Sequence, residues 1–319
     1  ALMQLVQLYR LGYRYRLQLW HPELKEIFLF SIPVMLGGAV MQVYTILIRF
    51  FAGGLEEGSI AAMNYAMLLM QLPQSVLVGT FANLLFPGLA EDAKEGRMQE
   101  LARSFVSGTR MSLLMLLPLS AFFIAYAPEL VGLLFGYGAF TEQDVERTAR
   151  LLIILSLGLP FHSLNLYWTR YFYSLRQSWG PVVASLGLVV GLNSLLSAWL
   201  RIPWGIEGIA ASVTITAILN TLVLLLLIRR KLDISGKMTD MWRASWQITI
   251  SSAVAGALAY GVKMGLLPLL PLSLVWERAV LVLIGSLIGA LMLLLLWRWM
   301  KLAEYQELRV KLLRRPTRL

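Results

Sequence analysis

The sequence predicts an all-α, polytopic membrane protein with about eight transmembrane helices. Of its 319 residues, 58% are hydrophobic and only 14% are charged, and the mean hydropathy is +0.69. Ordinary soluble domains carry about 45–50% apolar and about 25% charged residues. The charged residues also cluster between long apolar runs, so they cannot cover the surface of a soluble core.

Eight apolar runs predict the individual helices, because a transmembrane helix needs about 20 apolar residues in succession. The runs cover residues 27–50, 59–86, 105–127, 148–172, 181–200, 205–228, 244–262 and 278–297. The apolar stretch 1–9 is too short to cross a bilayer alone. We expect it to be the end of a helix that begins upstream.

The basic residues predict the orientation, because cytoplasmic loops of membrane proteins carry the excess of Lys and Arg. The loops on one side of an eight-helix arrangement hold 22 of the 28 basic residues, and those on the other side hold 6. Both termini are therefore expected in the cytoplasm. The net charge is +10, and the basic residues that produce it flank apolar spans. We therefore expect anionic phospholipids, and not nucleic acid, as their partner.

Small residues and prolines predict how the helices bend and pack. Two Gly-x-x-x-Gly pairs, which begin at Gly187 and Gly285, predict close contacts between helices. Prolines inside the runs remove backbone donors and predict kinks. They are Pro33, Pro73, Pro118 and Pro160.

Polar side chains in the first two spans are the candidate binding residues. Asn64 and Gln71 are seven residues apart, so they share one face of a helix. Polar groups are costly against lipid, so these two either bond to neighbouring helices or line a wet cavity. Arg49 is the only basic residue of the first span, and it either extends to the membrane surface or faces a cavity.

Motifs of enzymes and cofactor sites are missing from the sequence. It has no cysteine and only two histidines, which excludes thiolate sites and disfavours zinc. It contains no His-Glu-x-x-His, Gly-x-Ser-x-Gly or P-loop motif. We expect no catalysis and no cofactor.

Five segments, in order and spacing, carry a family resemblance. They are Gly58–Ala66, Leu85–Glu91, Leu133–Thr141, Tyr171–Leu175 and Gly205–Ser212. Together they resemble the MurJ/MviN lipid II flippases of the MOP exporter superfamily, closely to about residue 232 and more loosely beyond it.

The resemblance implies a division of the chain into four parts. Residues 1–26 would be the end of a preceding helix and a cytoplasmic linker, and residues 27–232 the six-helix C-terminal lobe. Residues 233–300 would be a terminal helix pair with a groove for the lipid tail. Residues 301–319 would form a basic amphipathic tail on the cytoplasmic surface. The N-terminal lobe of the family is missing from this sequence, which makes it a partner of the chain.

The resemblance also implies a function. Such proteins move lipid II, a polyprenyl-diphosphate-linked peptidoglycan precursor, from the cytoplasmic to the outer leaflet of the bacterial inner membrane. An anionic headgroup needs a polar cavity to cross hydrocarbon, and alternating access exposes that cavity to each side in turn. Arg49, Asn64 and Gln71 are the expected substrate-binding residues.

Several positions depart from the family pattern. Met67 and Leu68 stand where members often carry a charged pair, and Ile48 stands where members often carry an acid before Arg49. Asn193 matches a residue of the sodium site described for some members, but Ser197 stands at the position of its acid. We therefore expect no bound metal, with Asn193 as a remnant of that site, and coupling to sodium or membrane potential stays open.

Two other functions remain open from the sequence. The lost charges at Ile48, Leu68 and Ser197 suit a degenerate, non-transporting homologue that acts as a membrane scaffold for cell-envelope synthesis. A flippase for another lipid-linked glycan is the other alternative, because headgroup selectivity depends largely on the missing lobe.

Overall fold

The computed structural model describes residues 22–177, 179–232, 234–266 and 274–300, and every regular element in these ranges is helical. The predicted all-α membrane fold is confirmed, since long apolar helices make up the described chain. The predictions for residues 1–21 and for the tail 301–319 lie outside the described residues.

The helices begin and end close to the predicted spans. In chain order they are α2 (Pro22–Ala52), α3 (Ser59–Pro73), the π-helical η1 (Gln74–Gly79), α4 (Thr80–Lys94), α5 (Met98–Phe135), α6 (Glu142–Ser174), α7 (Trp179–Ser185), the π-helical η2 (Leu186–Leu192), α8 (Asn193–Arg229), α9 (Ser235–Leu266) and α10 (Leu274–Trp299).

Seven stretches of the described chain are long and apolar enough to cross a membrane, and not eight, because one of them contains two predicted spans. This stretch, Trp179–Arg229, turns sharply at Gly205, whose φ of 55° and ψ of −131° are not helical. Asn193 hydrogen-bonds to Thr216 at 3.4 Å, although a straight helix would separate them by about 35 Å. The stretch is therefore a helical hairpin.

The breaks in the helices differ from those that the prolines predict. Non-helical dihedral angles are found at none of Pro33, Pro118 and Pro160, and the α-helix changes to the π-helical η1 directly after Pro73. The break in α5 is instead at Tyr126, two residues before Pro128. The Tyr126 hydroxyl donates to the carbonyl of Ala259 in α9 at 2.6 Å. Because proline has a φ suited to a helix, losing one donor does not force a break unless packing also favours it.

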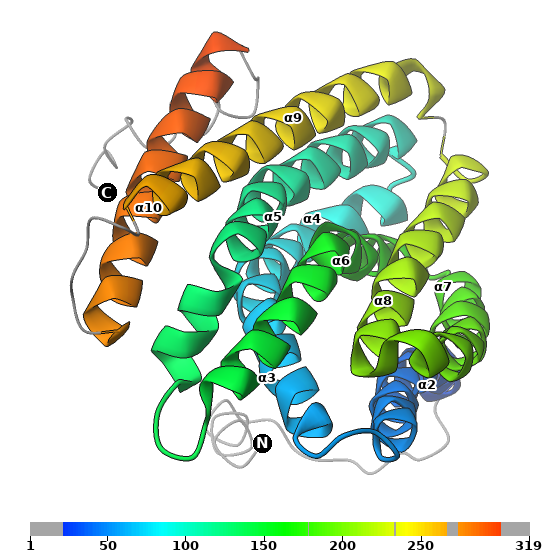
Figure 1. Cartoon of the computed structure of the whole chain (residues 1–319). Coiled ribbons are helices and arrows are strands. Elements are labelled where there is room, and N and C mark those ends of the chain that lie inside the picture. The colour runs from blue at the N-terminus through cyan, green and yellow to red at the C-terminus, as the bar shows by residue number, and fades with distance from the viewer. Residues whose placement is uncertain (1–21, 178, 233, 267–273, 301–319) are drawn as a thin grey trace, which may run out of the picture.

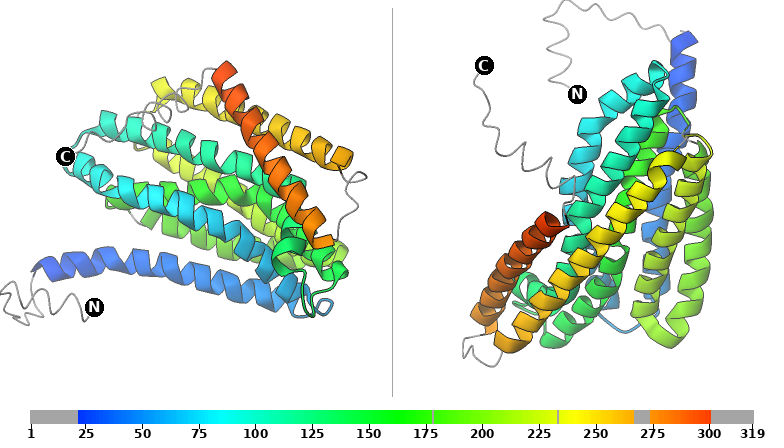
Figure 2. Two further views of the ribbon diagram at one scale, coloured as in Figure 1. Left: turned by 90° about the vertical axis from the view of Figure 1, so that its left-hand side faces the viewer. Right: turned by 90° about the horizontal axis from the view of Figure 1, so that it is seen from above.

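The terminal helices lie together on one side of the bundle (Figures 1 and 2). There α9 packs along α5 and α10 packs on α9, while α2 lies on the opposite side against α7 and α8. Helices α5 and α6 form the centre. They approach so closely that a Cβ at Gly108 would overlap the side chain of Tyr167.

The two predicted Gly-x-x-x-Gly contacts have different outcomes. Gly285 packs directly against the ring of Tyr126, and a Cβ on Gly289 would lie 3.8 Å from the Cβ of Ala259. A Cβ on Gly187 would meet nothing within 4 Å, so the contact predicted there is wrong. Gly187 lies in η2, where the wider π turn changes which residues share a face.

Candidate functional site

The three predicted substrate-binding residues lie on exposed parts of α2 and α3. Arg49 is exposed in the last turn of α2, and Asn64 and Gln71 are exposed on α3, with the exposed Leu68 between them. No side-chain hydrogen bond or ion pair ties any of the three to another described residue. Their role in binding stays a prediction.

A polar cavity of about 450 Å³ lies inside the lobe, between α2, η1, α6, α7 and α8. Its wall includes Gln74, whose amide donates to the carbonyl of His162 at 3.3 Å. Asn165 donates to the carbonyl of Ala217 at 3.2 Å and accepts from Thr221 at 3.1 Å. Several polar side chains of α6, α8 and η1 thus meet inside the membrane-spanning part of the protein.

The cavity contains polar groups without partners. Nε2 of His162 and Oδ1 of Asn220 are buried and have no hydrogen-bond partner among the described residues. Arg170 also lines the cavity and makes no ion pair with any residue that the structure describes, and no carboxylate is part of the lining. The cavity is therefore suited to water or to a neutral or anionic polar group.

A larger, apolar groove of about 780 Å³ lies between one face of α9 and the neighbouring helices α5, α6 and α8. Its walls are one face of α9, from Met241 to Tyr260, and parts of α5, α6 and α8. The face of α9 combines small residues with hydroxyls, namely Ser245, Thr249, Ser252, Ala253, Gly256 and Ala257.

The hydroxyls do not make the groove polar, because each is already bonded within its own helix. Ser245 donates to the carbonyl of Met241, Thr249 to that of Ser245, and Ser252 to that of Ile248. What remains is a long apolar channel suited to a hydrocarbon chain. The sequence contains its signal as small residues at intervals of three and four along α9, which hydropathy alone does not reveal.

A buried ion pair lies close to one end of the groove. Nζ of Lys263 lies 2.7 Å from Oε1 of Glu129, and the two side chains are only 8% and 9% exposed. Nζ also donates to the carbonyl of Ala125 at 3.3 Å and lies over the rings of Tyr126 and Tyr260. The sequence does not suggest this pairing, since the two residues are 134 positions apart.

Asn193 lies in a cluster of neutral, hydrogen-bonded side chains. Asn193 donates to the hydroxyls of Ser212 and Thr216 at 3.4 Å, and its carbonyl accepts from Ser197. Ser197 and Ser212 are hydrogen-bonded at 2.6 Å. All four side chains are neutral, buried and bonded to one another, so the cluster contains no carboxylate. No group of three His, Asp or Glu residues in the described ranges could hold a metal.

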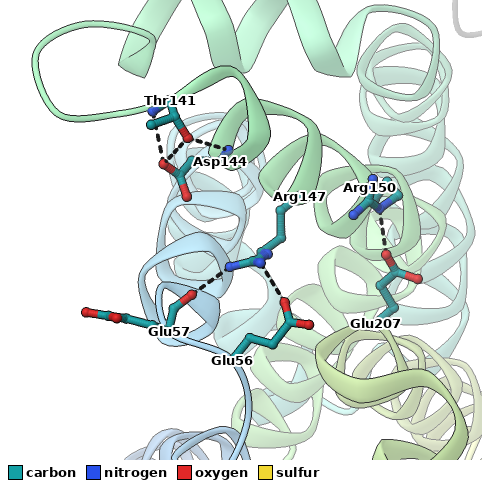
Figure 3. A network of polar contacts seen from close by, with 7 residues as sticks. All are labelled: Glu56, Glu57, Thr141, Asp144, Arg147, Arg150 and Glu207. Atoms are coloured by element: carbon teal, nitrogen blue, oxygen red, sulfur yellow. Dashed lines mark hydrogen bonds and ion pairs between the residues drawn. The ribbon is translucent and has the colours of Figure 1, made fainter.

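One end of the bundle is tied by charged side chains (Figure 3). Arg147 of α6 donates to the Glu56 carboxylate at 2.6 Å and to the Glu57 carbonyl at 2.7 Å. Arg150 pairs with Glu207 at 2.6 Å. These contacts join the α2–α3 connection, the start of α6 and the turn of the α8 hairpin, and thereby fix the helix ends around the exposed face of α3.

Comparison with protein families places most of the chain in one group. Residues 1–280 match the family described as lipid II flippase MurJ. The probable lipid II flippase MurJ of Bdellovibrio bacteriovorus is 30% identical over 232 residues, which are 72% of this chain and 44% of that protein. The Treponema pallidum protein of the same name is 25% identical over 284 residues, which are 88% of this chain and 51% of that protein. The chain spans about half the length of the curated relatives that it matches.

Solved structures support the fold. A lipid II flippase MurJ in an inward closed conformation matches with a TM-score of 0.69 and 19% identity, over 91% of this chain and 57% of the other. A MATE structure in complex with MaD3S matches with a TM-score of 0.53 and 16% identity, over 87% of this chain and 66% of the other. At these identities the likeness concerns the arrangement of helices alone.

Proposed function

Because the chain belongs to the lipid II flippase MurJ family, we propose that it forms the C-terminal half of a carrier for lipid II. The carrier moves this polyprenyl-diphosphate-linked peptidoglycan precursor from the cytoplasmic to the outer leaflet of the bacterial inner membrane. The observation that carries the proposal is the apolar groove along α9, which accompanies a separate polar cavity in the same half. A lipid with a polar head and a long tail needs both environments.

The chemistry of the cargo explains why a carrier is needed. A diphosphate with attached sugars cannot enter hydrocarbon without partners for its charges and hydroxyls. A protein cavity that replaces its water, and that opens to each side in turn, lowers this barrier without chemical change to the lipid. The protein is thus a membrane transporter and not an enzyme.

The headgroup is expected to lie against the exposed face of α3. Among the described residues, the amide groups of Asn64 and Gln71 have no hydrogen-bond partner there, and Arg49 supplies a cation without an ion-pair partner at the end of α2. In the proposed carrier, residues 27–232 form one wall of the central cavity, and the other lobe forms the opposite wall. Residues 233–300 hold the tail, and both termini lie in the cytoplasm.

The experiment introduces single substitutions into this chain and tests the variant proteins in the host organism. Ala253 lines the groove and Val254 does not, so Ala253→Trp fills the groove and Val254→Trp serves as the matched control. When Ala253→Trp is the only copy of the protein in the cell, lipid II should accumulate in the cytoplasmic leaflet. The measurement is the accessibility of lipid II to an enzyme added outside the cell. The control should keep the normal distribution. Unchanged lipid II in both strains, and after depletion of the protein, would contradict transport.

The alternative, a non-transporting scaffold, has one observation in its favour. Ile48 is 5% exposed and packed in the apolar core, and Ser197 belongs to a neutral hydrogen-bonded cluster, so neither retains the charge of the family pattern. A scaffold predicts that depletion disturbs envelope synthesis while the distribution of lipid II between leaflets stays normal. The same depletion experiment therefore separates the two functions.

A further inference from the structure

The two ends of the apolar groove differ in a way that gives it a direction. Along α9 its lining runs from Met241 to Tyr260, which corresponds to about 29 Å of helix. This length is close to the thickness of the hydrocarbon core, about 30 Å. A chain in the groove would therefore lie across most of the bilayer.

The Lys263–Glu129 pair lies within one turn of Tyr260, the last residue of α9 that lines the groove, and neither partner lines the groove itself. The main chain of α5 is broken here at Tyr126, and the Ala125 carbonyl accepts from the lysine. The Tyr126 side chain is fully buried, bonded to α9 and packed on Gly285 of α10. Three helices are thus fastened together at this end, and its two buried charges are paired with each other.

The other end lies between the end of α8 and the start of α9. The last lining residues there are Leu225 on α8 and Met241 on α9. Residues four apart share a helix face, so Arg229 continues the face of Leu225 one turn beyond the groove. Lys237 continues the face of Met241 one turn before it. Each wall of the groove therefore carries a cation at its mouth.

These cations have no partner among the residues that the structure describes. Neither Arg229 nor Lys237 makes an ion pair or a side-chain hydrogen bond there. Residues 229–243 contain five basic and two acidic residues. The connection therefore carries a net positive charge, which favours an anionic group at the mouth.

We propose that this mouth is a docking site for the phosphate of a polyprenyl phosphate lipid, with Arg229 and Lys237 as ligands of the phosphate and the lipid's single chain in the groove. The direction follows from the charges at the two ends. The charges beyond Tyr260 are paired with each other, whereas Arg229 and Lys237 have no partner among the described residues, so the anionic head is expected at the mouth and the chain points towards Lys263. The inference rests on the proposed function for the choice of a polyprenyl lipid. It adds a place where the head is held at the outside of the lobe, away from the face of α3.

The test measures binding to the full chain in nanodiscs of neutral phosphatidylcholine by native mass spectrometry. The probes are undecaprenyl phosphate and undecaprenol, which share the chain but differ in the phosphate. The double variant Arg229→Gln/Lys237→Gln should bind undecaprenyl phosphate about ten-fold more weakly or worse, because it removes two charge-assisted contacts to the phosphate. Binding of undecaprenol should stay within about two-fold, since the groove is intact.

The matched control removes the same charge from the same connection. Arg230 and Lys231 are exposed and lie in the turn after α8, off the groove faces. Arg230→Gln/Lys231→Gln should leave the binding of undecaprenyl phosphate within about two-fold of the parent. Equal weakening by both double variants would overturn the site, because it would reflect the general attraction of a basic surface for anions.

The source of the phosphate is tested by two further probes. Inorganic phosphate and phosphatidylglycerol should bind the parent at least about ten-fold more weakly than undecaprenyl phosphate, since neither fills the groove with one long chain. Equal binding of phosphatidylglycerol, with the same loss in Arg229→Gln/Lys237→Gln, would overturn the assignment to a polyprenyl lipid. Failure of transport in the host with binding intact would contradict the proposed function and leave the docking site standing.

Discussion

At the scale of single residues, the Lys263–Glu129 pair is the feature most sensitive to change. Burial deprives both charges of hydration, and the attraction between them offsets this lost hydration only while both are present. Lys263→Met leaves the Glu129 carboxylate buried without its cation. The variant should lose about 3–5 kcal/mol of stability, measured by reversible unfolding in mixed micelles.

A double variant is the control for this prediction. Glu129→Leu/Lys263→Met replaces the pair by apolar side chains and should recover most of the lost stability, because no buried charge remains. A single Lys263→Met variant as stable as the parent would show that water reaches the carboxylate.

The Asn193 cluster gives a second prediction at this scale. A bound ion stabilises the folded state by an amount that grows with the logarithm of its concentration relative to its dissociation constant. Because the four side chains are neutral and bonded to each other, we propose that sodium does not bind here. The melting temperature should be the same in sodium chloride and potassium chloride at equal ionic strength. A rise specific to sodium, abolished by Asn193→Ala, would contradict this.

At the scale of elements, the turn at Gly205 decides whether α8 is one helix or a hairpin. Its dihedral angles lie in a region that only glycine adopts easily. Gly205→Ala should therefore destabilise the protein by about 1–3 kcal/mol, measured by the same unfolding assay.

Gly187→Ala is the matched control for the hairpin. Gly187 lies in η2 with helical neighbours, and a Cβ there would meet nothing within 4 Å. This substitution should be neutral or stabilising by about 0.5–1 kcal/mol, since alanine loses less conformational freedom than glycine. Equal destabilisation by both variants would mean that the turn is not the cause.

At the scale of the whole molecule, the orientation in the membrane is testable because the chain has no cysteine. Tyr137 is exposed in the connection between α5 and α6, and Lys94 is exposed at the end of α4. The distribution of basic residues predicts that these positions face opposite sides. Tyr137→Cys should react with a membrane-impermeant maleimide in intact cells, and Lys94→Cys only after permeabilisation. The reverse pattern would invert the proposed orientation.

The sequence predicts most of the helices because each membrane span is a local property of about 20 residues. Every predicted span falls within the helical stretches described above, including the two that join as the hairpin at Gly205. Proline positions were less informative, since α5 breaks at Tyr126 and not at Pro118. A break depends on what the neighbouring helix offers, and in α5 that is the Ala259 carbonyl and the Lys263 ammonium.

By itself, the sequence determined that this protein lives in a membrane, how its chain is divided into spans and which family it resembles, because hydropathy, charge and short motifs are local. Only the tertiary structure decided which polar side chains stay free, as Asn64 does, and which are tied, as Asn193 is. Only the tertiary structure also shows that Lys263 pairs with Glu129 and that an apolar groove lies nearby along α9. Those features depend on contacts between residues far apart in the chain, which no local pattern encodes.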